Sequence, residues 1–136
     1  MSTTGRAIFA VIAGAVVWAA PWVGGTQAAG AAFPTVLPAG QPVNDAAVLL
    51  GLIAYSMALS ILAGYVTAAV ASTRPIPAVW ALALLQLALG IGFEASAWSL
   101  TPVWYHVVFL LSIVPATVYG GRLRARGRPV RAAHPA

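Results

Sequence analysis

Four long apolar segments dominate the pattern of hydrophobic and polar positions, and short stretches of Pro, Gly and polar residues separate them. We predict helices over residues 7–25, 45–72, 78–99 and 102–119. A helix over the first of these ranges would measure about 28 Å, close to the thickness of a bilayer's hydrocarbon core. The pattern therefore predicts an all-α membrane protein, a four-helix antiparallel transmembrane bundle that forms a single domain over residues 1–136.

The longest connection, residues 26–44, carries no charge and is rich in Gly, Ala and Pro. Because prolines disfavour regular structure, we expect a loop here, resting on the outer face of the bilayer. At its end, Asn44 or Asp45 can cap the helix that follows, since a side-chain oxygen accepts from the free N–H groups of the first turn. Binding of a ligand or cation is the alternative role for Asp45.

The first apolar segment also allows a second interpretation, a cleaved signal peptide. Arg6 would then be its basic start, and residues 26–28 a small-residue cleavage site. Trp18 and Trp22 near the outer end, and the extension of the apolar run to Gly25, favour a retained helix in which both tryptophans are interfacial anchors.

All basic residues fall on one side of the predicted bundle. The chain has seven Lys and Arg residues, all of them Arg, and they precede the first segment, separate the second from the third, or follow the fourth (Arg6, Arg74, Arg122, Arg124, Arg126, Arg128 and Arg131). Because basic residues beside membrane-spanning helices stay in the cytoplasm, both termini are predicted to be cytoplasmic. Residues 120–136 would form a basic tail that contacts anionic lipid headgroups.

Composition supports a membrane environment. Hydrophobic residues make up 61% of the chain and charged residues 7%, whereas soluble domains have about 25% charged residues. The absence of Cys excludes disulfides and thiolate metal sites. Lys is absent too, and Ala, Gly, Val and Arg are abundant, which indicates a GC-rich bacterial genome and hence a plasma membrane. The net charge of +5 does not point to nucleic acid, because the arginines lie where lipid headgroups would be.

Small side chains recur every four residues in the second predicted helix and form a ridge there, at Ser56, Ser60, Gly64, Ala68 and Ser72. Such ridges let helix backbones approach closely in lipid. The ridge could pack within the chain, or against a second copy or a membrane partner. The sequence leaves these alternatives open.

Few polar residues lie inside the apolar segments. Gln86 and Glu94 are eight residues apart with Gly90 between them, so all three share one helix face. A hairpin of the third and fourth helices would bring Glu94 level with His106, where the two could hydrogen-bond or exchange a proton. Because an acidic residue in a membrane is unfavourable, it indicates a partner or a function. The simpler interpretation is that Glu94 reaches the outer surface or bonds to a neighbouring helix.

Several chemistries lack their residues. The sequence has neither HExxH nor GxSxG. Haem ligation by two histidines would need a second one in the bundle, and His134 lies in the tail. Small four-helix multidrug exporters carry an essential carboxylate in the first helix, which here has no ionisable group. We therefore expect no enzymatic activity, no cofactor and no metal.

The fourth segment resembles the last helix of a loose group of small four-helix membrane proteins of bacteria. It has an aromatic pair after Pro102, then Pro115, then Gly-Gly-Arg-Leu from Gly120. A His tends to precede the first proline in that group, whereas His106 follows it here. The resemblance implies a four-pass inner-membrane protein.

Two functions follow from these observations. The first is a non-enzymatic structural or accessory component that packs with membrane partners or with further copies of itself, through the ridge of small residues. The alternative is a small proton-coupled permease that uses Glu94 with His106 and Gln86.

Overall fold

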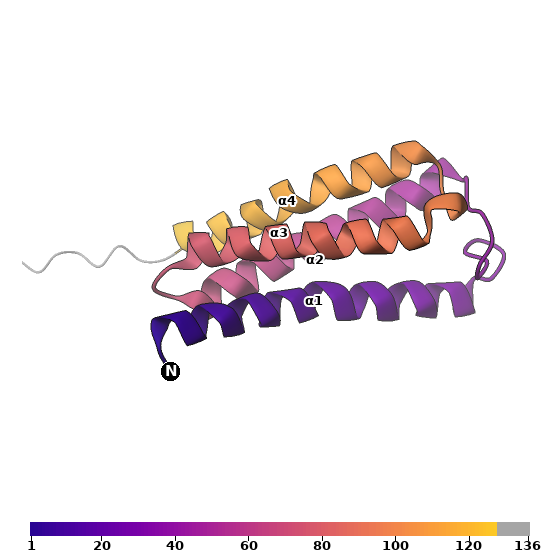
Figure 1. Ribbon diagram of the computed structural model, residues 1–136. Helices are drawn as coiled ribbons and strands as arrows, with labels where there is room; N and C mark the ends of the chain where they lie inside the picture. The colour runs from indigo at the N-terminus through magenta and orange to yellow at the C-terminus, as the bar shows by residue number, and fades with distance from the viewer. Residues whose placement is uncertain (128–136) are drawn as a thin grey trace, which may run out of the picture.

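A computed structural model describes residues 1–127, which fold into four long α-helices and one short 3₁₀ helix (Figure 1). The predicted tail positions Arg128 and Arg131 lie outside the described residues. The helices are α1 (Thr3–Ala32), α2 (Ala46–Ala71), α3 (Pro75–Ser96), η1 (Trp98–Leu100) and α4 (Val103–Arg126). All four α-helices are long and apolar enough to cross a membrane.

The helices run alternately up and down, so that α2 and α4 are parallel to each other (Figure 1). The N-terminus, the α2–α3 turn and the last turn of α4 lie at one end, which we call the arginine end because it carries Arg6, Arg74 and Arg126. The α1–α2 connection and η1 lie at the other, which we call the turn end. This arrangement is the predicted antiparallel bundle.

Helix α1 is longer than predicted, because it continues beyond Gly25 through Ala32 into the predicted loop. Two features support the extra turns. The Thr26 hydroxyl donates to the Trp22 carbonyl at 2.7 Å, and the following residues are mostly alanines, which favour helix. The helix ends where Phe33 precedes Pro34, since a residue before proline is disfavoured in helical conformation.

Helix α4 also extends beyond its predicted end at Tyr119 and includes Arg122, Arg124 and Arg126. Gly120 and Gly121 suggested a stop because glycine is a poor helix former. In the structure they are where α4 approaches two neighbours. A Cβ on Gly120 would overlap the Ile61 backbone of α2, and one on Gly121 would lie 2.6 Å from the Val79 side chain of α3. Close packing therefore outweighs local preference.

The ends of α2 and α3 follow from their flanking residues. Asp45 caps α2, since its Oδ1 accepts from Ala47 N at 2.9 Å and Val48 N at 3.1 Å, as the sequence predicted. Helix α3 begins at Pro75, three residues before its predicted start, because proline is well suited to the first helical position. It ends at Ser96, three residues early.

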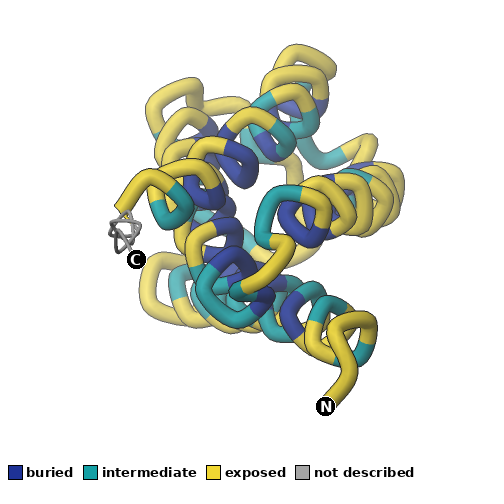
Figure 2. Tube along the Cα trace, turned by 90° about the vertical axis from the view of Figure 1, so that its left-hand side faces the viewer, coloured by how far each residue is buried: buried dark blue, intermediate teal, exposed yellow. Residues whose placement is uncertain are grey.

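The core lies along the bundle axis, and the outer faces of the helices are exposed (Figure 2). Helix α2 contacts all three other helices, most extensively α4. Trp18 and Trp22, predicted as interfacial anchors, are instead buried in this core. The Trp22 ring packs 5.2 Å from that of Phe109 and 5.9 Å from that of Tyr55. They lie one turn apart on α1, and their rings contact aromatic rings of α2, α3 and α4.

Candidate functional site

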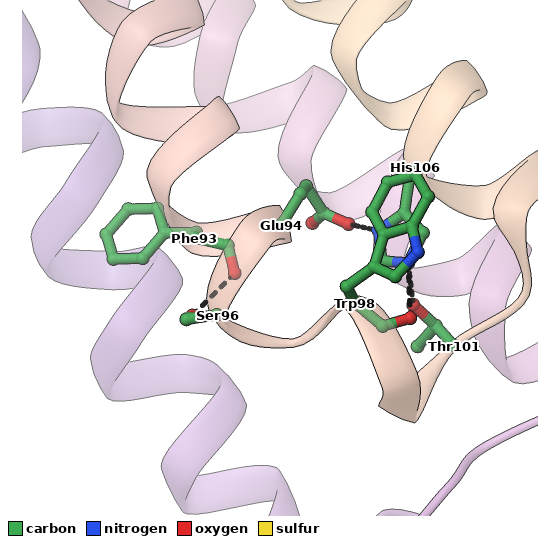
Figure 3. Close-up of polar contacts among 6 residues, drawn as sticks. All are labelled: Phe93, Glu94, Ser96, Trp98, Thr101 and His106. Carbon is green, nitrogen blue, oxygen red and sulfur yellow. Dashed lines mark hydrogen bonds and ion pairs between the residues drawn. The ribbon is translucent and has the colours of Figure 1, made fainter.

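Glu94 of α3 and His106 of α4 form the only side-chain ion pair within residues 1–127 (Figure 3). The His106 Nδ1 and Glu94 Oε2 atoms are hydrogen-bonded, so the structure brings together the two residues that the hairpin placed at one level. Both are buried, with 6% of Glu94 and 1% of His106 exposed. A buried carboxylate is unfavourable without a partner, and the imidazole supplies it.

The other ring nitrogen of His106 is held by the turn that joins α3 to α4. Its Nε2 lies 3.0 Å from Thr101 Oγ1 and 3.2 Å from the Trp98 carbonyl oxygen. The Trp98 ring stacks on the imidazole, with centroids 4.4 Å apart and planes 11° from parallel (Figure 3). Trp98 is itself half exposed, so it covers the histidine from outside.

Backbone contacts fix this turn in the bundle. Ala97 N donates to the carbonyls of Phe93 and Glu94 at 3.2 and 3.3 Å, and Leu100 N donates to Ala97 O at 2.9 Å. The α1–α2 connection joins it, because Val43 N donates to Leu100 O at 2.8 Å. The Glu94–His106 pair therefore lies where both connections of the turn end meet.

The partners of His106 limit where its protons can be. The Trp98 carbonyl can only accept a hydrogen bond, whereas the closer Thr101 hydroxyl can either accept from Nε2 or donate to it. When Nε2 carries a hydrogen, a proton shared by Nδ1 and Glu94 can lie on the ring, giving an imidazolium and a carboxylate, or on the acid, giving two neutral groups. Both states have zero net charge. The pair can therefore shift a proton internally without adding charge to the interior.

Gln86, the third predicted site residue, does not reach this pair. It is fully buried on α3, and its Oε1 accepts from the Thr117 hydroxyl of α4 at 2.5 Å. Its Nε2 has no hydrogen-bond partner within the described residues. Gln86 and Gly90 lie on the same buried face of α3 as Glu94. Gln86 and Glu94 nevertheless contact different residues of α4, at different levels of the bundle.

Other buried polar atoms lack partners in the described part of the chain. They are Trp18 Nε1 of α1 and the hydroxyls of Ser56 and Ser60 of α2. Buried donors without a partner are uncommon in proteins, and ordered water often satisfies them. Together with Gln86 Nε2, they are the buried side-chain polar atoms of the described residues that have no hydrogen-bond partner.

The ridge of small residues is buried inside the molecule. Gly64 lies against the Thr117 backbone of α4, and Ala68 packs with Val79 of α3 and Val118 of α4. Ser56 and Ser60 are fully buried, whereas Ser72 lies at the end of α2, where its Oγ accepts from Arg6 Nη1 at 3.2 Å. Ser56, Ser60, Gly64 and Ala68 are thus covered by other parts of the same chain.

The described arginines lie at the arginine end, away from both acidic residues of the chain. Asp45 and Glu94 are at the turn end, so Arg122 and Arg126 form no ion pair within residues 1–127. Arg124 differs from them, because its guanidinium lies over the Tyr65 ring, 6.0 Å from its centroid.

Sequence reasoning missed Trp98, Thr101 and Thr117 as partners of the polar residues. The spacing of residues in the sequence could have indicated two of them, Trp98 and Thr117. Trp98 follows Glu94 by four residues, one helical turn. In an antiparallel hairpin, moving back eight residues from Glu94 to Gln86 corresponds to moving forward about eight from His106, which ends within a turn of Thr117. The place of Thr101 depends on the 3₁₀ turn and had no such signal.

Within residues 1–127, no group of three His, Asp or Glu side chains could hold a metal ion. Comparison of the chain with protein-family models, with curated proteins and with solved structures finds no match.

Proposed function

We propose that the chain is a non-enzymatic integral membrane protein of the bacterial plasma membrane, with both termini in the cytoplasm, that serves as a structural or accessory component beside membrane partners. Membrane insertion is supported by the four apolar helices and by their outer surfaces, where large hydrophobic side chains are exposed along the whole length of the bundle. The orientation is supported by the arginines gathered at one end.

One observation carries the accessory role: the ionisable pair and the small-residue ridge, which are the features most able to bind something else, are occupied within the chain. Glu94 and His106 hold each other, and Gly64 lies against Thr117. The outer helix faces remain available to lipid and to other membrane helices. Helix α1 is the least buried, with Ile8, Ile12 and Val16 all more than half exposed on one face.

The membrane arrangement is tested by reporter fusions at Val36, Pro75 and Ala136. The proposal expects the first to report the periplasm and the other two the cytoplasm. A cytoplasmic signal at Val36 would overturn the orientation. Protease added to intact spheroplasts should leave the C-terminal end uncut.

The accessory role is tested by photo-crosslinking in the native membrane. A photoreactive residue at Ile12 or Val16 should give one discrete protein adduct. The matched control is Leu111, which is the most exposed large apolar residue of α4 and should react with lipid. Failure of both Ile12 and Val16 to capture a protein would contradict the proposal.

The second candidate is a small proton-coupled permease that uses Glu94, His106 and Gln86. It is favoured by the buried hydrogen bond between Glu94 and His106, which links two groups that can exchange a proton, and by the buried polar atoms without partners. In liposomes, Glu94→Gln should then abolish solute-dependent proton flux, while Asp45→Asn, which alters the only other acid, should preserve it. Equal flux in wild type and Glu94→Gln would rule the permease out.

A further inference from the structure

A groove of about 500 Å³ lies on the outside of the bundle at the arginine end. It is formed by one face of α4 and by Trp80 of α3, and its α4 lining includes Val114, Pro115, Val118, Tyr119, Arg122 and Arg126. These α4 residues follow helical spacing, so they form a continuous stripe. The stripe is apolar near Pro115 and becomes basic toward Arg126.

We propose that this groove binds one anionic phospholipid, with its phosphate between Arg122 and Arg126 and an acyl chain along Val114, Pro115 and Val118. The inference rests on the proposed membrane insertion, and it is independent of which end faces the cytoplasm.

Charge complementarity supports an anionic occupant. Arg122 and Arg126 are one turn apart, both are exposed, and neither forms an ion pair or a side-chain hydrogen bond within residues 1–127. The two acidic residues of the chain are at the opposite end. Two guanidinium groups at this spacing can hold one phosphate through charge-assisted hydrogen bonds.

The apolar part of the groove supports a lipid over a soluble anion. Pro115, Val118 and Trp80 present carbon surface directly beside the arginines. Tyr119 lies between the two regions and is more than half exposed, as is usual for an aromatic residue at the level of the headgroups. Basic pockets beside membrane-spanning helices bind anionic lipid headgroups.

The test measures lipid retention by native mass spectrometry on the full-length protein in mild detergent, titrated with phosphatidylglycerol or with phosphatidylcholine. Wild type should retain one phosphatidylglycerol molecule in preference to phosphatidylcholine. The double variant Arg122→Gln/Arg126→Gln should lose roughly twenty-five-fold in apparent affinity, since each arginine near an anionic surface contributes about fivefold. Equal retention of both lipids by wild type would overturn the proposal.

Further comparisons distinguish lipid binding in the groove from general charge attraction and from binding of a phosphate group alone. Arg6→Gln/Arg74→Gln removes the same charge from the same end outside the groove, and its affinity should stay within about twofold of wild type. An equal loss of affinity in both double variants would overturn the site.

Val114→Phe should fill the acyl-chain part of the groove and weaken binding, whereas Leu111→Phe, one turn away, should not. Full displacement of the lipid by equimolar glycerol phosphate would overturn the role of the acyl chain.

Discussion

Gly64 of α2 lies against the backbone of Thr117 on α4, with no room for a Cβ between them. The contact is reciprocal, because Gly120 of α4 lies against the Ile61 backbone of α2 in the same way. Two parallel helices thus meet backbone to backbone. In lipid, where apolar side chains gain little by leaving the solvent, such van der Waals contact is a main source of helix association.

Gly64→Ala should therefore destabilise the bundle by about 1–3 kcal/mol, because the added methyl meets backbone atoms that cannot rotate away. The measurement is the free energy of unfolding in mixed micelles of dodecyl maltoside and sodium dodecyl sulfate. The control is Gly51→Ala in the same helix, where a Cβ meets nothing within 4 Å. That variant should be neutral or gain up to about 1 kcal/mol, since alanine favours helix. Equal changes in the free energy of unfolding for the two variants would contradict the close contact at Gly64.

The Glu94–His106 pair should be strongly coupled in stability. Glu94→Leu and His106→Phe should each lower the free energy of unfolding by about 3 kcal/mol, because each leaves a polar group buried without its partner. The double variant should lose clearly less than the sum of the two single losses. Additive losses in this double-mutant cycle would mean that the two side chains do not interact.

Glu94→Gln should be mild by comparison, with a loss of about 1 kcal/mol. Its amide can donate to a bare Nδ1 or accept from a protonated one, so either neutral form of the ring keeps a partner. The nitrogen-15 chemical shifts of the His106 ring should then report a neutral imidazole. An imidazolium in this variant would contradict the hydrogen-bond pattern of the site.

Gln86→Leu should leave stability unchanged or raise it by up to about 1 kcal/mol, although it removes the acceptor of the Thr117 hydroxyl. A hydrogen bond between membrane helices contributes about 0.6 kcal/mol on average, and the variant also removes a buried amide nitrogen that lacks a partner. The same unfolding assay measures this, with Thr117→Val as the control. A loss above about 2 kcal/mol would mean that Nε2 has a partner such as bound water.

Local rules predicted the number and direction of the helices and the Asp45 cap, because apolar length and capping chemistry act within a few residues. They failed where tertiary contact decides. Gly24-Gly25 and Gly120-Gly121 indicate helix ends by intrinsic preference, yet Gly25 and Gly120 lie inside helices where another helix or side chain fills the space of a Cβ. A glycine that ends a helix and one that admits a neighbour look alike in sequence.

The candidate site was likewise predictable only in part. Helical spacing and a hairpin placed Glu94 beside His106, because both rules are geometric. The contact of Thr101 with His106 depends on the 3₁₀ turn, whose shape no local pattern indicated, whereas the four-residue spacing between Glu94 and Trp98 was a signal that the prediction did not use. The burial of Trp18 and Trp22 escaped prediction because a tryptophan near a helix end suits an interface and a core equally well, and the extension of α1 to Ala32 places both well inside the helix.

Tyr55 should stabilise the contact between α1 and α2 through its hydroxyl, which donates to the Pro21 carbonyl at 2.6 Å. Tyr55→Phe should lower the free energy of unfolding by about 1 kcal/mol, since the ring keeps its stacking on Trp22 and only the hydrogen bond is lost. Gly25→Ala should cost more, because its methyl would occupy the place of the hydroxyl. In the Tyr55→Phe background, however, Gly25→Ala should cost less than it does alone, since the overlapping atom is gone. Unfolding free energies of the four proteins measure this coupling, and strict additivity would show that Gly25 does not accommodate Tyr55.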